Sequence, residues 1–238
     1  MNDEQAIVPS PEVFWNYEDL IVFGGALLPA LIAGRLIAAL AARIAGVDKG
    51  VEGFILQFVA YGCWFLALYG LFRFKHGRPF WESLSWNPDW RRIGVSFLLG
   101  IAVAIGLIVT SALVDMPQLD ATPMQELLSG DLTLLLVGVF STTLGPLCEE
   151  LAFRGFLMPL FSRSFGITAG IVLATVPFAV AHAPQYAFSW RHVALVGLAG
   201  IAFGWTRFRT GSTAAATAMH SAYNLTIFAG LMYERHSW

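Results

Sequence analysis

The sequence predicts an all-α protein, a polytopic membrane helical bundle of about seven to eight transmembrane helices that enclose an intramembrane polar cavity. Hydrophobic residues make up 57% of the 238-residue chain and charged residues only 13%, whereas about a quarter of the residues in soluble domains are charged. The apolar residues gather in runs of about 20, the length a helix needs to cross a bilayer. Ionisable side chains inside the later runs predict the polar cavity, because such groups avoid lipid.

The apolar runs give the predicted helices in chain order. The candidate spans are residues 20–42, 51–72, 93–114, 132–160, 166–183, 192–208 and 211–232. The fourth run is long and contains Gly145-Pro146, and a break there would produce the eighth helix. The first run is too long for the apolar part of a signal peptide and follows acidic residues without Lys or Arg, so we expect it to be retained.

Loop composition predicts which parts of the chain lie at each membrane surface. Residues 73–92 combine tryptophans with basic residues, as segments at a membrane–water interface do. Basic residues, with Arg154 counted among them, are more frequent in the loops on the side of the N-terminus, which predicts that this side is cytoplasmic. Residues 115–131 contain no Lys or Arg, and we expect an outer loop there with a short amphipathic helix at residues 124–128.

The chain is expected to form one integral membrane domain with two parts. Residues 1–131 would supply the N-terminal tail, three transmembrane helices and the outer loop, and residues 132–238 a helical core. The net charge of −2 gives no basic surface for nucleic acid. The two cysteines, Cys63 and Cys148, lie in apolar runs and show no disulfide framework or zinc-ribbon spacing. The sequence does not determine the oligomeric state.

The stretch Pro146-Leu-Cys-Glu-Glu-Leu-Ala-Phe-Arg154 carries three charged side chains in the fourth run. Glu150 and Arg154 are four residues apart with the acid first, the favourable order for an ion pair within a helix. Glu149 lies roughly 100° further around the helix and points elsewhere. It has no partner on its own helix, which makes it the candidate general base.

Later runs carry two further polar pairs at the spacing of one helical turn. Phe178 precedes His182, and His220 precedes Asn224, by four residues each. Taken singly, a membrane histidine can bond a neighbouring helix, and an asparagine or a Glu–Arg pair can tie helices together. Their concentration in one half of the chain instead favours one shared site holding a carboxylate, two imidazoles and an amide.

This set of side chains suits the hydrolysis of an amide bond without a covalent intermediate. A carboxylate and a histidine can activate water, and a second histidine with an amide can stabilise the oxyanion. Glu149, His182 and His220 could instead bind Zn²⁺. No His-Glu-x-x-His pair lies on one helix, so the spacing favours a site without metal or other cofactor.

The ordered motifs Glu149-Glu150-x-x-x-Arg154, Phe178-x-x-x-His182 and His220-x-x-x-Asn224 resemble the CAAX protease and bacteriocin-processing (CPBP, or ABI) family, which includes the type II CAAX prenyl endopeptidases. The resemblance covers residues 132–232 and implies an intramembrane endopeptidase.

The same resemblance implies a role for each motif residue. It makes Glu149 the general base and His182 a residue that helps to bind and activate the water. It places His220 and Asn224 at the oxyanion. The remaining motif residues are implied to support the site or line it: Glu150, Arg154 and Phe178.

The substrate implied by the resemblance is a membrane-associated protein or peptide, prenylated CAAX proteins among the candidates, cut near the membrane surface. The lipid bilayer is the other expected partner. The chain would then be a multi-pass membrane protein, of the cell membrane if prokaryotic. One alternative is a non-enzymatic immunity or assembly protein whose polar residues only tie helices together. A proton-coupled transporter is a weaker alternative, because the sequence shows no inverted repeat.

The predicted helix boundaries place Glu149 and His182 near opposite membrane faces, since each lies late in its own run. A shared site requires similar depth. We therefore expect a break or a tilt in the fourth run, or a shift at Pro177 or Pro184, to bring the two residues level.

Overall fold

The computed structural model describes residues 13–117, 119 and 130–236, and this part of the chain is helical without strands. The short helix predicted at residues 124–128 lies outside the described residues. The first half contains α1 (Tyr17–Gly25), α2 (Leu27–Ala45), α3 (Lys49–Gly70) with a π-helical end (Leu71–Lys75), α4 (Phe80–Ser83) and α5 (Trp90–Leu113). The second contains α7 (Asp131–Thr142), α8 (Leu144–Glu150), a π-helical segment (Leu151–Leu157), α9 (Met158–Phe165), α10 (Ile167–Ala181), a 3₁₀ turn (Ala183–Tyr186), α11 (Trp190–Thr210) and α12 (Thr213–His236).

The helices confirm that the chain is an integral membrane helical bundle. Four stretches of the described residues are long and apolar enough to cross a bilayer: Tyr17–Ala45, Lys49–Lys75, Trp90–Leu113 and Asp131–Phe165. Helix α10 is apolar but shorter. Helices α11 and α12 have 21 and 24 residues and are less apolar because they carry many of the buried polar side chains. The number of crossings, about seven to eight, stays a prediction.

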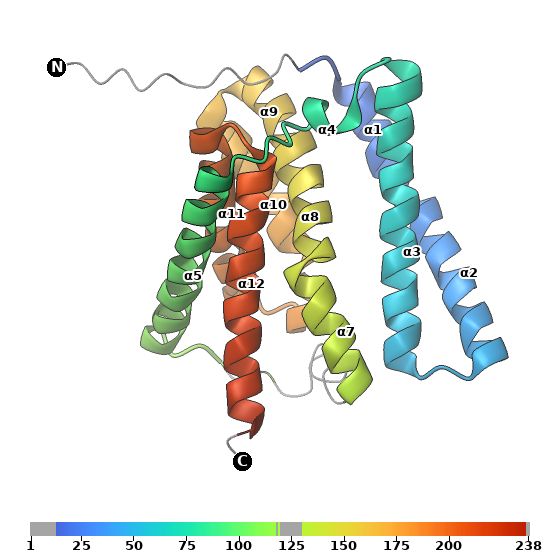
Figure 1. Ribbon diagram of the computed structural model, residues 1–238, viewed down its shortest axis with the longest axis vertical. Helices are drawn as coiled ribbons and strands as arrows, with labels where there is room; N and C mark the ends of the chain where they lie inside the picture. The colour runs from blue at the N-terminus through green and yellow to red at the C-terminus, as the bar shows by residue number, and fades with distance from the viewer. Residues whose placement is uncertain (1–12, 118, 120–129, 237–238) are drawn as a thin grey trace.

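Helix α12 packs against α5, α7, α8 and α11, so it contacts helices from both halves of the chain (Figure 1). The first part of α12 is rich in small residues, and Ala214, Ala215 and Ala216 are buried. On α5, a Cβ atom added at Gly100 would collide with the Met219 carbonyl. The two backbones are therefore in direct contact, which only small side chains allow.

Helices α2 and α3 form a pair at one side of the molecule, away from α5 (Figure 1). The buried carboxylate of Asp19 connects the segment before α2 with the segment after α3. It accepts hydrogen bonds from Lys75 Nζ at 2.7 Å and from the Asn16 backbone N–H at 3.0 Å, and it lies 3.1 Å from His76 Nε2. Nearby, Trp15 Nε1 donates to the Phe156 carbonyl at 3.1 Å. The Asp19 contacts therefore join α1 to the end of α3, and the Trp15 bond attaches the N-terminal region to the second half of the chain.

The long fourth run is divided, as the sequence predicts. Thr143, with φ −128° and ψ −84°, separates α7 from α8, and the π-helical segment follows Glu150. The whole stretch from Asp131 to Phe165 has 35 residues, so Glu149 lies near its middle. Helix α10 has 15 residues and ends at Ala181. A long broken helix beside a short one brings Glu149 and His182 to the same depth, and the apparent mismatch in the sequence disappears.

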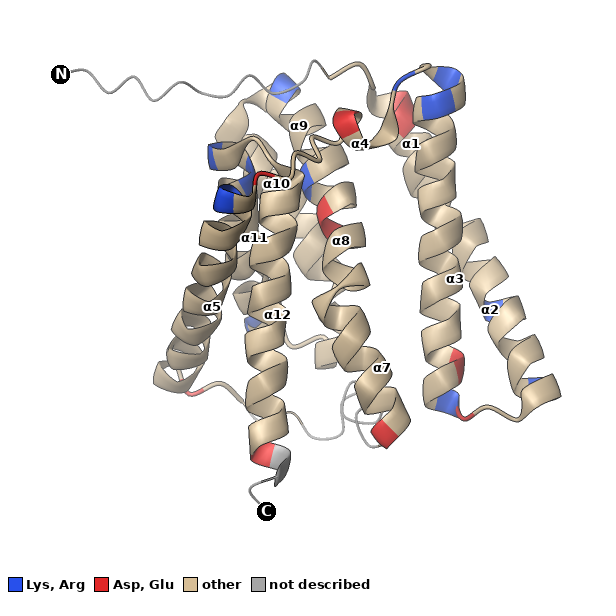
Figure 2. Ribbon diagram, in the orientation of Figure 1, with Lys and Arg blue, Asp and Glu red and all other residues tan. Residues whose placement is uncertain are grey.

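Charged residues lie mainly toward the two ends of the bundle, and α8 carries acidic residues within it (Figure 2). Lys and Arg are most frequent at the end that holds α4 and α9 (Figure 2). Arg154, which a loop-charge count assigns to the cytoplasmic side, is instead buried inside the bundle at 1% exposure. That part of the count is wrong, because the residue lies in a continuous helical stretch rather than in a loop.

Candidate active site

The predicted ion pair between Glu150 and Arg154 forms in the interior of the bundle. Arg154 Nη1 donates to Glu150 Oε1 at 2.8 Å, and both side chains are buried. The other terminal nitrogen, Nη2, donates to the Gly200 carbonyl on α11 at 2.8 Å. A Cβ atom at Gly200 would lie 3.1 Å from Nη2, 2.9 Å from Thr175 and 3.0 Å from Phe178. Glycine therefore lets α11 approach the guanidinium closely.

Two aromatic rings cover the Arg154 guanidinium. Its Cζ lies 4.4 Å from the centre of the Phe178 ring and 5.4 Å from that of Phe203, within the range of cation–π attraction. The Phe178 ring also contacts His182, with 4.6 Å between ring centres. Phe178, 1% exposed, thus separates the buried cation from the imidazole and supports both.

His220 is oriented by Glu150 across 70 residues of chain. Its Nδ1 lies 2.9 Å from Glu150 Oε1, the same oxygen that binds Arg154. A carboxylate in an ion pair can only accept, so Nδ1–H is the donor. The ring also stacks on Phe203, with centres 4.4 Å apart and planes 20° apart. With Nδ1 fixed in this way, Nε2 lies 3.8 Å from Glu149 Oε2.

His182 is held in the same tautomer by a different partner. Its Nδ1 lies 2.8 Å from the Phe178 carbonyl one turn earlier on α10, and a carbonyl oxygen can only accept. The other nitrogen, Nε2, lies 3.7 Å from Glu149 Oε2. In a neutral ring with hydrogen on Nδ1, Nε2 is the acceptor. Both histidines therefore present Nε2 to the same carboxylate oxygen.

Glu149 differs from Glu150 in its exposure and its partners. Its side chain is 18% exposed, against 0% for Glu150. Oε2 faces the two imidazoles at distances longer than a direct hydrogen bond, while Oε1 accepts a hydrogen bond from the Tyr61 hydroxyl at 3.3 Å. Separations of this size suit a water molecule bridging polar groups. Glu149 is thus the accessible carboxylate of the site.

Asn224 lies one turn after His220 on α12, as predicted, and its amide is engaged with α7. Nδ2 donates to the Ser141 carbonyl at 2.7 Å. This carbonyl lies in the last turn of α7, where helix carbonyls lack partners within the helix. An amide has two N–H donors, so one remains for another acceptor. The bond to Ser141 is one that the sequence did not predict, and a role for Asn224 at the oxyanion stays a prediction.

Tyr61 is the site residue that sequence reasoning missed. It comes from α3, in the half of the chain where no site residue was expected. The available signal was a tyrosine hydroxyl in an apolar run, because a buried Tyr O–H usually finds a hydrogen-bond partner. The acceptor lies 88 residues away along the chain, and no local pattern connects the two positions.

Glu149, His182 and His220 are side-chain types that also bind metal ions. Among residues 13–117, 119 and 130–236, no group of three or more His, Cys, Asp and Glu side chains is arranged to hold a metal ion. The residue types of Glu149, His182 and His220 suit Zn²⁺, and a site that works without metal stays a prediction.

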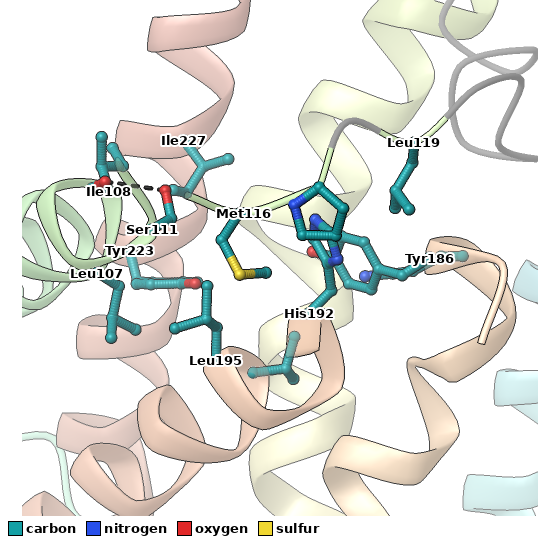
Figure 3. Close-up of a pocket in the computed structure, with 13 residues that line it drawn as sticks. Leu107, Ile108, Ser111, Met116, Leu119, Tyr186, His192, Leu195, Tyr223 and Ile227 are labelled. Atoms are coloured by element: carbon teal, nitrogen blue, oxygen red, sulfur yellow. Dashed lines mark hydrogen bonds between the residues drawn. The ribbon is translucent and has the colours of Figure 1, made fainter. Parts of the chain in front are cut away.

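A cavity of about 420 Å³ lies between α5, α11, α12 and the turn that follows α10, and Tyr223 lines it (Figure 3). Its walls combine apolar side chains such as Leu107 and Ile227 with polar ones. Tyr186 and His192 stack there with ring centres 5.3 Å apart. Tyr223 also contacts Phe203, the ring on which His220 stacks. The cavity therefore neighbours the site without being lined by Glu149, His182 or His220.

The comparison with protein families gives a match over residues 131–226, to a family described as Type II CAAX prenyl endopeptidase Rce1-like. The match begins at the first residue of α7. It contains every site residue predicted from the sequence and leaves out Tyr61. No curated protein and no solved structure matches the chain.

Proposed function

We propose that this chain, a member of the CAAX protease family through residues 131–226, is an intramembrane endopeptidase that cuts a peptide bond of a membrane-associated protein or peptide. The family description extends the proposal to prenylated CAAX-type substrates. The observation that carries the proposal is the convergence of His182 Nε2 and His220 Nε2 on one oxygen of Glu149, at 3.7 and 3.8 Å.

In the proposed reaction, Glu149 is the general base. A water bound between its carboxylate and His182 Nε2 loses a proton to Glu149 and attacks the scissile carbonyl carbon. The new C–O bond forms as the carbonyl oxygen takes negative charge. Collapse of this tetrahedral intermediate breaks the C–N bond, and Glu149 returns the proton to the leaving nitrogen.

His220 and the free N–H of Asn224 are proposed to stabilise the oxyanion. Donation from His220 Nε2 requires the doubly protonated ring, since Nδ1–H already donates to Glu150. The bond from Nδ1 to Glu150 fixes the orientation of the ring and with it the direction of Nε2. Glu150 and Arg154 therefore support the chemistry through His220 rather than by contacting substrate.

The proposal is tested by comparing peptide termini in membranes containing the wild type, Glu149→Gln or His182→Ala. Both variants should lose the cleavage products while keeping the melting temperature of the wild type. Cys148→Ala is the matched control, because it changes the neighbouring residue and should leave cleavage intact. Full cleavage by Glu149→Gln would overturn the assignment.

The alternative, a membrane protein whose polar residues only tie helices together, is favoured by one set of contacts. Glu150, Arg154 and Asn224 all make buried or partly buried bonds between helices or along one. Glu149 does not fit this explanation, because its only hydrogen bond to the described protein is the 3.3 Å contact with Tyr61. Under the alternative, Glu149→Gln would keep the biological function.

A further inference from the structure

We propose that Tyr61 on α3 is a positioning residue for the reaction. Its hydroxyl holds Oε1 of Glu149 and leaves Oε2 directed at the two imidazoles. This inference rests on the proposed function. It adds to the site a residue from outside the matched segment 131–226.

The two oxygens of the Glu149 carboxylate face two different kinds of partner. Oε1 is 3.3 Å from the Tyr61 hydroxyl, and Oε2 is 3.7 Å from His182 Nε2. The phenol is the donor, because the ionised carboxylate has no proton to give. A general base works best when the oxygen that takes the proton has a fixed direction. The phenol supplies that fixed direction by occupying the other oxygen.

The Tyr61 ring is itself held in place by packing. It contacts Phe140 on α7, with ring centres 5.7 Å apart, and Phe140 in turn contacts Phe54 on α3 at 5.6 Å. Close by on α3, Trp64 Nε1 donates to the Phe23 carbonyl at 2.7 Å, and the two rings stack 4.4 Å apart. These contacts fix α3 relative to α1 and α7. The phenol is thus placed by packing and does not depend on its hydrogen bond for its position.

The hydrogen bond between Tyr61 and Glu149 lies in a partly buried and largely apolar part of the bundle. Glu149 is 18% exposed, and the surrounding residues of α3 are predominantly apolar. A hydrogen bond to a charged acceptor is stronger than a neutral one, and more so where water is scarce. Loss of the phenol would therefore free the carboxylate to rotate away from His182 and His220.

The test is Tyr61→Phe in the full-length protein in detergent or liposomes, assayed on a peptide that the wild type cleaves. The ring contacts with Phe140 persist, so the melting temperature should stay unchanged. We expect kcat to fall about 10-fold, with KM changed by less than 2-fold. Tyr69→Phe is the matched control on the same helix, because Tyr69 is 43% exposed, and it should behave as the wild type.

The outcomes separate this inference from the proposed function. Absence of cleavage by the wild type would contradict the proposed function itself. Cleavage by the wild type with an undiminished kcat in Tyr61→Phe would overturn the role of Tyr61 alone. A change confined to KM, or a fall in kcat that follows a lower melting temperature, would also overturn it, since either would indicate substrate binding or packing.

Discussion

Glu150 connects two side chains through a single oxygen, because both Arg154 and His220 bind its Oε1 at 2.8 and 2.9 Å. The spacing in the sequence predicts the first contact, since residues four apart share a helix face. The second contact depends on how α12 packs beside α8, and no local pattern reveals it. Glu150 is thus a structural and an orienting residue at once, while Glu149 next to it stays accessible.

Replacing Glu150 by Ala should both destabilise the protein and reduce cleavage. The change leaves the Arg154 guanidinium buried without its counter-ion, at a cost of about 3–5 kcal/mol. It also removes the acceptor that orients His220. Thermal unfolding in detergent measures the first effect and peptide cleavage the second. A Glu150→Ala variant with wild-type stability would contradict the stabilising role of the ion pair. Glu18→Gln, at an exposed position, serves as the control.

Chelation tests the proposal that the site works without metal. Glu149, His182 and His220 have the side-chain types of a zinc site, but no metal-binding arrangement is found among the described residues. We expect purified active protein to contain far less than one zinc per chain by elemental analysis and to keep its activity after strong chelation. Loss of activity on chelation that is restored by stoichiometric zinc would overturn the metal-free mechanism.

At the level of helices, the site depends on a break between α7 and α8 and on the close packing of α11 against Arg154. The break at Thr143 sets α8 apart from α7, and the π-helical segment Leu151–Leu157 follows Glu149 and Glu150. Such segments are frequent at functional sites because they shift the register of the side chains that follow. The close approach is that of α11 to Arg154 at Gly200, whose carbonyl accepts a hydrogen bond from Nη2 at 2.8 Å.

Gly200→Val should destabilise the protein by about 1–3 kcal/mol, as overpacking of a dense interior does. The new side chain would press against Arg154, Thr175 and Phe178, whose nearest atoms lie 2.9–3.1 Å from an added Cβ. Gly197→Ala on the same helix is the control, because its Cβ would lie 3.7 Å from Ala179. Thermal unfolding compares the two. Equal melting temperatures would contradict the close approach.

On the scale of the whole molecule, the bundle is electrostatically asymmetric. Lys and Arg are most frequent at the end that holds α4 and α9 (Figure 2). Basic residues favour the cytoplasmic side of a membrane. The two histidines and Glu149 are supplied by α8, α10 and α12, and Tyr61 by α3, so elements from both halves of the chain meet at the site.

Cysteine labelling of intact cells tests the predicted orientation. A membrane-impermeant thiol reagent should label Lys49→Cys, at the end opposite to α4, and leave Arg78→Cys, in the loop before α4, unlabelled until the membrane is opened. Both positions are exposed. The parent with Cys63 and Cys148 replaced by Ala gives the background. The reverse labelling pattern would invert the assignment.

The sequence predicts the class of the molecule, the approximate positions of its helices and the residue pairs that share a helix face. An apolar composition indicates that the chain lies in a membrane, and the helical period determines which residues share a helix face. The sequence therefore predicts five of the candidate site residues, and their roles stay a prediction: Glu149, Glu150, Arg154, His182 and His220.

Only the tertiary structure decided which groups meet across the chain. It joined His220 to Glu150, turned Asn224 toward Ser141 and brought Tyr61 to Glu149 over 88 residues. The depth of Glu149 relative to His182 depends on the break at Thr143 and on the short length of α10. The physical reason is that contacts between helices depend on where each helix bends and ends, and these features are set by packing against neighbours rather than by a local repeat.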